Sequence, residues 1–401
     1  MFLRTLLATS LTLAMSTSAV ATQSESTEKK ASTTKSSTQA ANSKKTEQKA
    51  TNKATASKPV AKPTTANKAT TEKEKTKTNK ATTNSTTASK ATTAAPKPVA
   101  KLGWTLEQIN DATWSENIGT GQLPIFAKAQ VMLNNAYAPA GAIDAASGQK
   151  TDKALRAFQV IYGLQKTGVL DQATWDKLVE LNQNQPTYVE YTITAEDVNK
   201  SQYVASIPAD YGLKAKMKAL AYTRVSEMLG EKFHMDETFL QRLNPHAKFV
   251  AGEKIIVANV TNTLPEDITL IVAHKTAKQL YLFNSKNQMV GSFPATFGND
   301  PKALVGEHTI VGVARNPWYS YSPSNFVQGN NLKPLSLPPG PNGPVGNIWI
   351  GLSKKSFGIH GTPDPSKIST NHSHGCIRLS NWDANNLGNY VQKGVSVRFV
   401  D

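Results

Sequence analysis

Residues 268–297 read ITLIVAHKTAKQLYLFNSKNQMVGSFPATF, and this stretch decides the fold of the C-terminal third of the chain. It contains three short runs of β-branched and aromatic residues, which favour strands, with a turn at residues 284–287. Further runs of this kind occur at residues 309–314, 347–352 and 395–400. Sequential short strands with tight turns are typical of antiparallel sheets, so we predict a mostly-β sandwich or barrel over residues 267–401.

A long segment, residues 316–346, separates two of these runs and is rich in proline, glycine, asparagine and aromatic residues. A loop of this length inside a compact domain is usually a lid or a binding loop. We therefore expect Trp318 and Tyr319, near its start, to contact a substrate.

The densest group of reactive side chains lies in two segments, residues 360–365 (HGTPDP) and residues 371–380 (NHSHGCIRLS). Cys376 is the only cysteine in 401 residues. A cysteine attacks as its thiolate, which forms near neutral pH only beside a cation, a base or a helix N-terminus. His360 lies 16 residues upstream, across two prolines, so a loop can fold it back onto Cys376. Such a Cys–His pair is the minimal arrangement for acyl transfer.

The neighbours of Cys376 suit the same chemistry. Gly375 allows backbone N–H groups to converge on one place, as an oxyanion hole requires. Arg378 is a fixed cation that can hold a carboxylate or the loop itself.

Two other interpretations of these residues remain open. His372, His374 and Cys376 alternate along the chain, and with His360 they make a ligand set that zinc accepts. Gly375 favours a turn over a regular strand at this point, which argues against a shared ligand face. A lone cysteine is also often an inert, buried side chain.

The N-terminus predicts export. Arg4 precedes an apolar run at residues 6–15, and Ala19-Val-Ala forms a small-x-small cleavage pattern. We expect residues 1–21 to be a signal peptide and the protein to act in the periplasm or cell wall. The apolar run is half the length that spans a bilayer, so we expect no transmembrane segment in the mature protein. An exported protein normally pairs its cysteines, so an unpaired one points to a reactive group.

Residues 22–100 consist almost entirely of small and polar residues with many lysines, without an aromatic residue, and we expect them to be a disordered linker. Most of the formal charge of +16 lies here, because residues 22–101 contain 17 lysines and five glutamates. The charge therefore gives no reason to expect nucleic acid as a partner. We expect this linker to adhere weakly to anionic envelope polymers.

Aromatic residues return at Trp104 and begin a helical unit over residues 104–182. In residues 151–162 the apolar positions recur on one helical face, with Thr151 as the predicted N-cap. The order of the segments AKAQVML from 127, GAID from 141, GQKTDKALRAFQ from 148 and TGVLD from 167 resembles the peptidoglycan-binding domain. The alternative is another three-helix scaffold with the same apolar face.

Residues 188–260 predict an α+β unit in the order strand, helix, helix, strand, which resembles a sugar-binding LysM module. The unit departs from that pattern because residues 198–221 are an extra stretch and Glu196-Asp replaces the usual Gly-Asp. Glycan binding and a purely structural spacer are therefore both open.

The segments Ile359-His-Gly-Thr and Ser373-His-Gly-Cys-Ile-Arg, with Asn316-Pro-Trp and Pro338-Pro-Gly-Pro-Asn-Gly-Pro-Val-Gly, closely resemble the signature of the L,D-transpeptidase (YkuD-domain) family. The resemblance covers residues 267–401. It implies that Cys376 is the nucleophile and His360 the proton donor and acceptor. The supporting residues that it implies around them are Gly361, Ser373, His374, Gly375 and Arg378, the Gly361 carbonyl orienting His360.

The family's reaction is acyl transfer on peptidoglycan stem tetrapeptides without a metal or organic cofactor. The implied products are D-Ala and either 3→3 cross-links or exchanged terminal residues, and carbapenems are expected to acylate the cysteine. The alternatives are an L,D-carboxypeptidase or lipoprotein-attaching enzyme with the same site, a zinc-dependent enzyme, and a catalytically inactive wall-binding protein.

Overall fold

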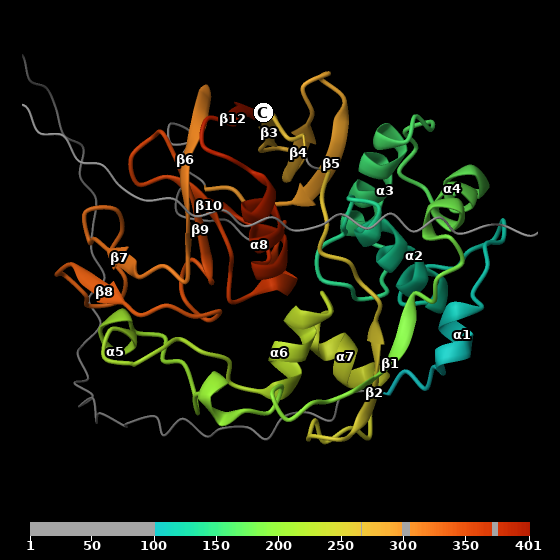
Figure 1. The fold of residues 1–401 in the computed structure, drawn as a ribbon, viewed down its shortest axis with the longest axis horizontal. Helices are drawn as coiled ribbons and strands as arrows, with labels where there is room; N and C mark the ends of the chain where they lie inside the picture. The colour runs from blue at the N-terminus through green and yellow to red at the C-terminus, as the bar shows by residue number, and fades with distance from the viewer. Residues whose placement is uncertain (1–100, 266, 299–304, 371–375) are drawn as a thin grey trace, which may run out of the picture. The chain divides into compact units, whose positions relative to one another are not determined.

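The computed structural model describes residues 101–265, 267–298, 305–370 and 376–401 (Figure 1). The predicted signal peptide and linker lie outside the described residues. No helix within the described ranges is long and apolar enough to cross a membrane.

The first unit is helical, as predicted. Its helices are α1 (Leu106–Asn110), α2 (Pro124–Asn135), α3 (Gln149–Ile161) and α4 (Gln172–Asn182). Thr105 caps α1 in a capping box with Gln108, and Asp171 caps α4. The prediction that Thr151 is an N-cap is wrong: α3 begins two residues earlier, and the buried Thr151 hydroxyl donates to the Ala146 carbonyl instead.

The elements of the second unit are β1 (Tyr188–Thr192), a 3₁₀ turn (Lys200–Gln202), α5 (Tyr211–Lys214), α6 (Val225–Lys232), α7 (Glu237–Leu243) and β2 (Lys254–Ala258). The unit contains the two predicted strands and the two predicted helices, α6 and α7, and adds a 3₁₀ turn and a short helix, α5, in the extra stretch. Strands β1 and β2 pair antiparallel, with Tyr191 opposite Ile255. Ile109 and Val131 of the helical unit are buried in one cluster with Tyr188 and Phe239, so the two units share a core. The resemblance to a LysM module stays a prediction.

The third unit is strand-rich, as predicted, and its main sheet runs in the order β11-β10-β9-β6-β12-β3-β4-β5. These strands are β3 (Leu270–His274), β4 (Gln279–Phe283), β5 (Met289–Pro294), β6 (Glu307–Arg315), β9 (Ile348–Leu352), β10 (Gly358–His360), β11 (Ile377–Arg378) and β12 (Ser396–Val400). All neighbouring pairs are antiparallel except β10 with β11 and β12 with β3. Helix α8 (Asn381–Tyr390), capped by Ser380, lies against β9 and β10 (Figure 1).

The core of this unit forms from the apolar residues of the sheet and the inner face of α8. Its fully buried members include Ile271, Leu280, Ile350, Ile359, Ile377, Leu387 and Val397. Each such side chain contributes about 1.5–3 kcal/mol by its removal from water, so the inner strands β9 and β10 are firmly held.

The segment 316–346, predicted as a loop, contains a small separate hairpin. Strands β7 (Tyr319–Tyr321) and β8 (Leu335–Leu337) pair antiparallel, with Tyr319 opposite Leu337. Tyr321 and Leu337 are buried in a cluster with Leu220 of the second unit, and this packing stabilises strands that are too short to be stable alone.

Candidate active site

The parallel pairing of β10 with β11 brings the two reactive segments together. Ile359 lies opposite Ile377, and His360 lies opposite Arg378. Because side chains alternate along a strand, the two isoleucines point into the core, where both are fully buried. His360 and Arg378 therefore share the other face, and Cys376, the residue just before β11, lines the same cavity as both of them.

His360 is held in one orientation. The residue is 4% exposed, and its Nδ1 lies 2.7 Å from the Gly361 carbonyl oxygen. Only a protonated Nδ1 can donate to a carbonyl, so in the neutral ring Nε2 is the acceptor. The ring stacks on Trp349 of β9, with centroids 5.6 Å apart and an interplanar angle of 15°. The contact of His360 with the Gly361 carbonyl, implied by the resemblance, is present.

Electrostatics keep this imidazole neutral. The pKa of His360 is lowered to about 3, first by burial and then by the positive charge of Arg378, while the hydrogen bond to Gly361 acts in the opposite direction. At neutral pH the side chain is therefore a base with an unoccupied proton site rather than an imidazolium.

Cys376 is a thiol in this environment. Burial raises its pKa, and the smaller effects of the Gly358 amide and the Arg378 charge lower it. Its Sγ donates to the Ser356 carbonyl oxygen at 3.9 Å. Arg378 is the cation near the thiol, but its effect on the pKa of Cys376 is smaller than that of burial. Cys376 therefore needs a base to remove its proton before it can attack.

The Asn381 side chain occupies the space that a side chain at position 361 would need, so glycine fits there. A Cβ at Gly361 would collide with the Asn381 amide oxygen. The Asn381 Nδ2 donates to the Glu231 carboxylate at 2.7 Å and to the Pro341 carbonyl at 3.2 Å. Asn381 therefore packs behind the loop whose carbonyl fixes His360.

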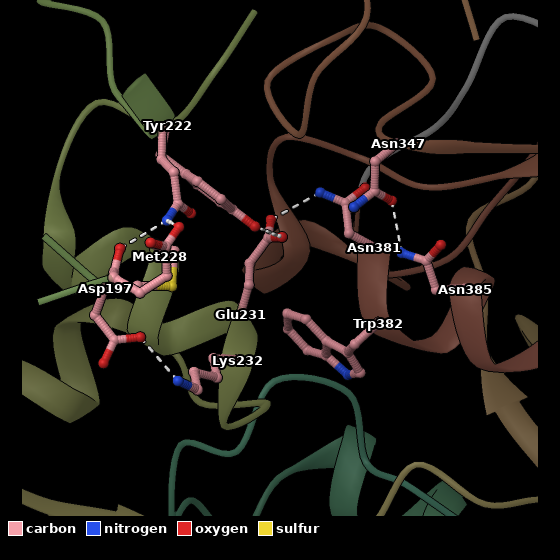
Figure 2. A pocket seen from close by; sticks show the side chains of 11 residues that line it. Asp197, Tyr222, Met228, Glu231, Lys232, Asn347, Asn381, Trp382 and Asn385 are labelled. Atoms are coloured by element: carbon pink, nitrogen blue, oxygen red, sulfur yellow. Dashed lines mark hydrogen bonds and ion pairs between the residues drawn. The ribbon is translucent and has the colours of Figure 1, made fainter. Parts of the chain in front are cut away.

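Glu231 extends this support into the second unit. Figure 2 shows its carboxylate between Asn381 and Tyr222, whose hydroxyl donates to it at 3.0 Å. These residues line a cavity of about 440 Å³ together with Trp382 and Lys232 (Figure 2). Burial raises the pKa of Glu231 to about 8, against the lowering effect of its two hydrogen bonds.

A second cavity, of about 640 Å³, opens onto Cys376, and we name it the cleft. The residues lining it are Tyr211, Ala314, Pro317, Trp318, Tyr319, Ser320, Asn325, Phe326, Pro344, Val345, Trp349, Ser356, Phe357, His360, Cys376 and Arg378. Trp318 is 60% exposed, which is unusual for so large an apolar side chain. The structure thus brings together Cys376, His360, Arg378, Trp318 and Tyr319.

The remaining predicted residues, Ser373, His374 and Gly375, lie outside the described residues, as does His372 of the zinc alternative. Within the described ranges, no group of three or more His, Cys, Asp or Glu side chains is arranged to hold a metal ion. The zinc interpretation therefore stays a hypothesis.

Four residues at or behind the cleft were not predicted from the sequence: Tyr211, Trp349, Glu231 and Asn381. The only sequence signal for Tyr211 was its place in the extra stretch 198–221, which does not fit the LysM pattern. Trp349 was assigned only to a strand, and nothing local marks Glu231 or Asn381.

Comparison with known proteins places these residues in context. Residues 268–398 match the family model described as "L,D-transpeptidase catalytic domain", and residues 124–178 match the "Putative peptidoglycan binding domain". The "Putative L,D-transpeptidase YkuD" of Bacillus subtilis is 28% identical over 170 residues, which cover 41% of this chain and 87% of that protein. A "Putative L,D-transpeptidase" of Fuscovulum blasticum is 30% identical over 132 residues, covering 33% of this chain and 69% of that protein.

The crystal structure of L,D-transpeptidase 3 from Mycobacterium tuberculosis aligns with 18% identity and a TM-score of 0.28. That alignment covers 37% of this chain and 66% of the mycobacterial one.

Proposed function

The chain belongs to the L,D-transpeptidase family, and on that premise we propose that Cys376 carries out acyl transfer on peptidoglycan stem tetrapeptides through a thioester. The observation that carries this proposal is the common face of β10 and β11. At that face, a thiol and a neutral imidazole whose Nδ1–H is held by a carbonyl line one cleft.

The first half-reaction forms the thioester. His360 Nε2 takes the proton of the Cys376 thiol as sulfur attacks the carbonyl of the third stem residue, the L-centre of diaminopimelate. As the family resemblance implies, the amides of Gly375 and Cys376 stabilise the resulting oxyanion, and Ser373 and His374 act as supporting residues. When the intermediate collapses, the proton passes from His360 to the departing amine, and D-Ala leaves.

The second half-reaction returns the thiol. An amine from a second stem attacks the thioester and gives its proton to His360, and the departing sulfur takes that proton back. With the diaminopimelate side-chain amine as acceptor the product is a 3→3 cross-link; a free D-amino acid gives an exchanged terminus. A lipoprotein lysine would instead attach a protein, and water would make the enzyme an L,D-carboxypeptidase.

Arg378 suits a negatively charged donor. Its side chain lines the cleft, and none of the described residues hydrogen-bonds its Nε. We assign the guanidinium the role of binding a stem-peptide carboxylate, because Arg378 lines the cleft, and its charge also stabilises the thiolate as it forms. Trp318 and Tyr319 offer flat apolar surfaces for the substrate chain.

The other parts of the chain suit work at the wall. Residues 124–178 bring the enzyme to peptidoglycan, which is its partner. We propose that residues 1–21 direct export to the periplasm or cell wall and that the basic linker adheres to anionic envelope polymers. Acylation of Cys376 by carbapenems follows from the same thiol chemistry.

The test measures D-Ala release from purified stem tetrapeptide, with products identified by mass spectrometry. We expect Cys376→Ala to fold with an unchanged thermal unfolding curve and to release no D-Ala. Release at the wild-type rate would overturn the thiolate mechanism. Activity that disappears with a chelator and returns with zinc would favour the metal alternative, and no activity in the wild type would favour a wall-binding role alone.

A further inference from the structure

One stretch of the second unit reaches the third unit's cleft. Residues 198–221, which we name the insertion, carry α5, and α5 lies beside β8 of the hairpin (Figure 1). Among the described residues that line the cleft, Tyr211, the first residue of α5, alone comes from outside residues 267–401.

Hydrogen bonds join the middle of the insertion to the hairpin loop. The Tyr211 amide donates to Gln328 Oε1 at 2.9 Å, and Gln328 Nε2 donates to the Ala209 carbonyl at 3.1 Å. Asn331 Nδ2 donates to the Asp210 carboxylate at 2.8 Å. The backbone and side chains of residues 209–211 are thus bound to the loop between β7 and β8.

The C-terminal end of the insertion is bound to the chain that follows the hairpin. The Leu220 amide donates to the Pro339 carbonyl at 2.9 Å, and the Asn342 amide donates to the Leu220 carbonyl at 2.9 Å. Gly340 lies so close that a Cβ there would collide with the Leu220 carbonyl. Glycine at 340 therefore permits this close approach between backbones.

Aromatic packing fills the space between the two attachments. The Tyr211 ring meets Tyr321, Tyr319 and Phe326 edge to face, with centroids 5.3, 6.1 and 6.2 Å away. This geometry is the favoured one for aromatic pairs. Tyr319 and Phe326 line the cleft themselves, so Tyr211 supports two side chains of the cleft wall and is part of that wall.

The effect of Arg378 on the Tyr211 phenol also supports a place for Tyr211 near the reactive residues. Burial raises the pKa of Tyr211, and the charge of Arg378 lowers it, which places the phenol within electrostatic reach of the arginine.

We propose that the insertion completes the donor-binding site: Tyr211 forms part of the cleft wall and holds the β7–β8 hairpin where the stem peptide binds. The inference rests on the proposed function for the identity of the donor. It makes the second unit a determinant of substrate affinity. The donor class is an extended peptide with apolar stretches beside a carboxylate, because the wall is aromatic and Arg378 lies in the same cleft.

The first experiment measures kcat and KM for D-Ala release from stem tetrapeptide by the full chain. We expect Tyr211→Ala to raise KM about tenfold with kcat little changed, as for the loss of one or two buried aromatic contacts. Tyr211→Phe keeps the ring and is expected to restore KM. Gln328→Ala, whose side chain does not line the cleft, should raise KM less. Leu213→Ala is the matched control, because Leu213 lies on the same helix and is 53% exposed.

The second experiment needs no turnover and measures hydrogen–deuterium exchange of the backbone amides of residues 319–337. We expect faster exchange in Tyr211→Ala and wild-type exchange in Tyr211→Phe and Leu213→Ala. Unchanged exchange, or an unchanged KM in an active Tyr211→Ala enzyme, would overturn the inference. A wild-type protein that releases no D-Ala would contradict the proposed function instead, and the exchange data would still decide whether the insertion holds the hairpin.

Discussion

Glu231 is a buried carboxyl group, and its replacement should change how the free energy of unfolding depends on pH. Its pKa is raised from 4.5 to about 8 by burial between Tyr222 and Asn381. Below the pKa of Glu231 in the unfolded chain, the carboxyl group is protonated in both the folded and the unfolded protein. Burying it then does not lower the free energy of unfolding through a change in protonation. As pH rises toward the folded value, the unfolded chain loses the proton that the folded protein keeps, and the free energy of unfolding falls by about 1.4 kcal/mol per pH unit.

The magnitude follows from the width of that window. The loss accumulates between about pH 4.5 and pH 8 and reaches the order of 4–5 kcal/mol, an upper figure because local relaxation reduces it. Glu231→Gln has the same shape; its oxygen can accept from Asn381 and its amide can donate to the Tyr222 hydroxyl. We expect the variant to resemble wild type near pH 5 and to be more stable by several kcal/mol near pH 8.

The assay is denaturant unfolding monitored by tryptophan fluorescence from about pH 5 to pH 9. Asp383, whose pKa burial raises to about 7, adds its own slope to both proteins, so the difference between the two curves isolates Glu231. Glu196→Gln is the control, because Glu196 lines the same cavity but is exposed. Parallel curves for wild type and Glu231→Gln across the whole range would show that Glu231 does not keep its proton in the folded protein.

Three further predictions concern the reactive residues. Because the pKa of His360 is lowered to about 3, its imidazole stays neutral above that value. We therefore expect that kcat/KM for D-Ala release does not fall between about pH 7 and pH 5. A decline with a midpoint near 6.5 would contradict the lowered pKa of His360. Arg378→Met removes a charge that lowers the thiol pKa, so the pH midpoint for iodoacetamide alkylation of Cys376 should move upward, whereas Arg398→Met, away from the cleft, should leave it in place. Gly361→Ala should force Asn381 away from the loop whose carbonyl holds His360 and lower kcat about 100-fold. Gly312→Ala is the control, because a Cβ at Gly312 meets no other atom. Equal activities of the two variants would show that the position of this loop does not matter for catalysis.

Much of the third unit could be predicted from sequence because its strands are local signals. The runs at 268–273, 279–283 and 395–400 each combine β-branched and aromatic residues and form β3, β4 and β12. The pairing of His360 with Cys376 was predicted from residue chemistry and motif. The β10–β11 register places His360 opposite Arg378, and His360 and Cys376 line the same cavity.

What the sequence did not indicate depends on contacts between distant segments. Tyr211 meets the hairpin more than 100 residues away, and Glu231 meets Asn381 across 150 residues. No local pattern encodes such contacts. The three-residue strands β7 and β8 are likewise stabilised by packing against Leu220 rather than by propensity, so the segment looked like an unstructured loop.

The most direct test of the central claim is intact-mass and peptide-mapping mass spectrometry of the wild-type protein quenched in acid during turnover of stem tetrapeptide. We expect a covalent adduct of the tripeptide acyl group on the peptide that contains Cys376, formed with one equivalent of D-Ala and discharged by an added amine. Turnover without any adduct on Cys376, or an adduct on another residue, would contradict the thioester mechanism.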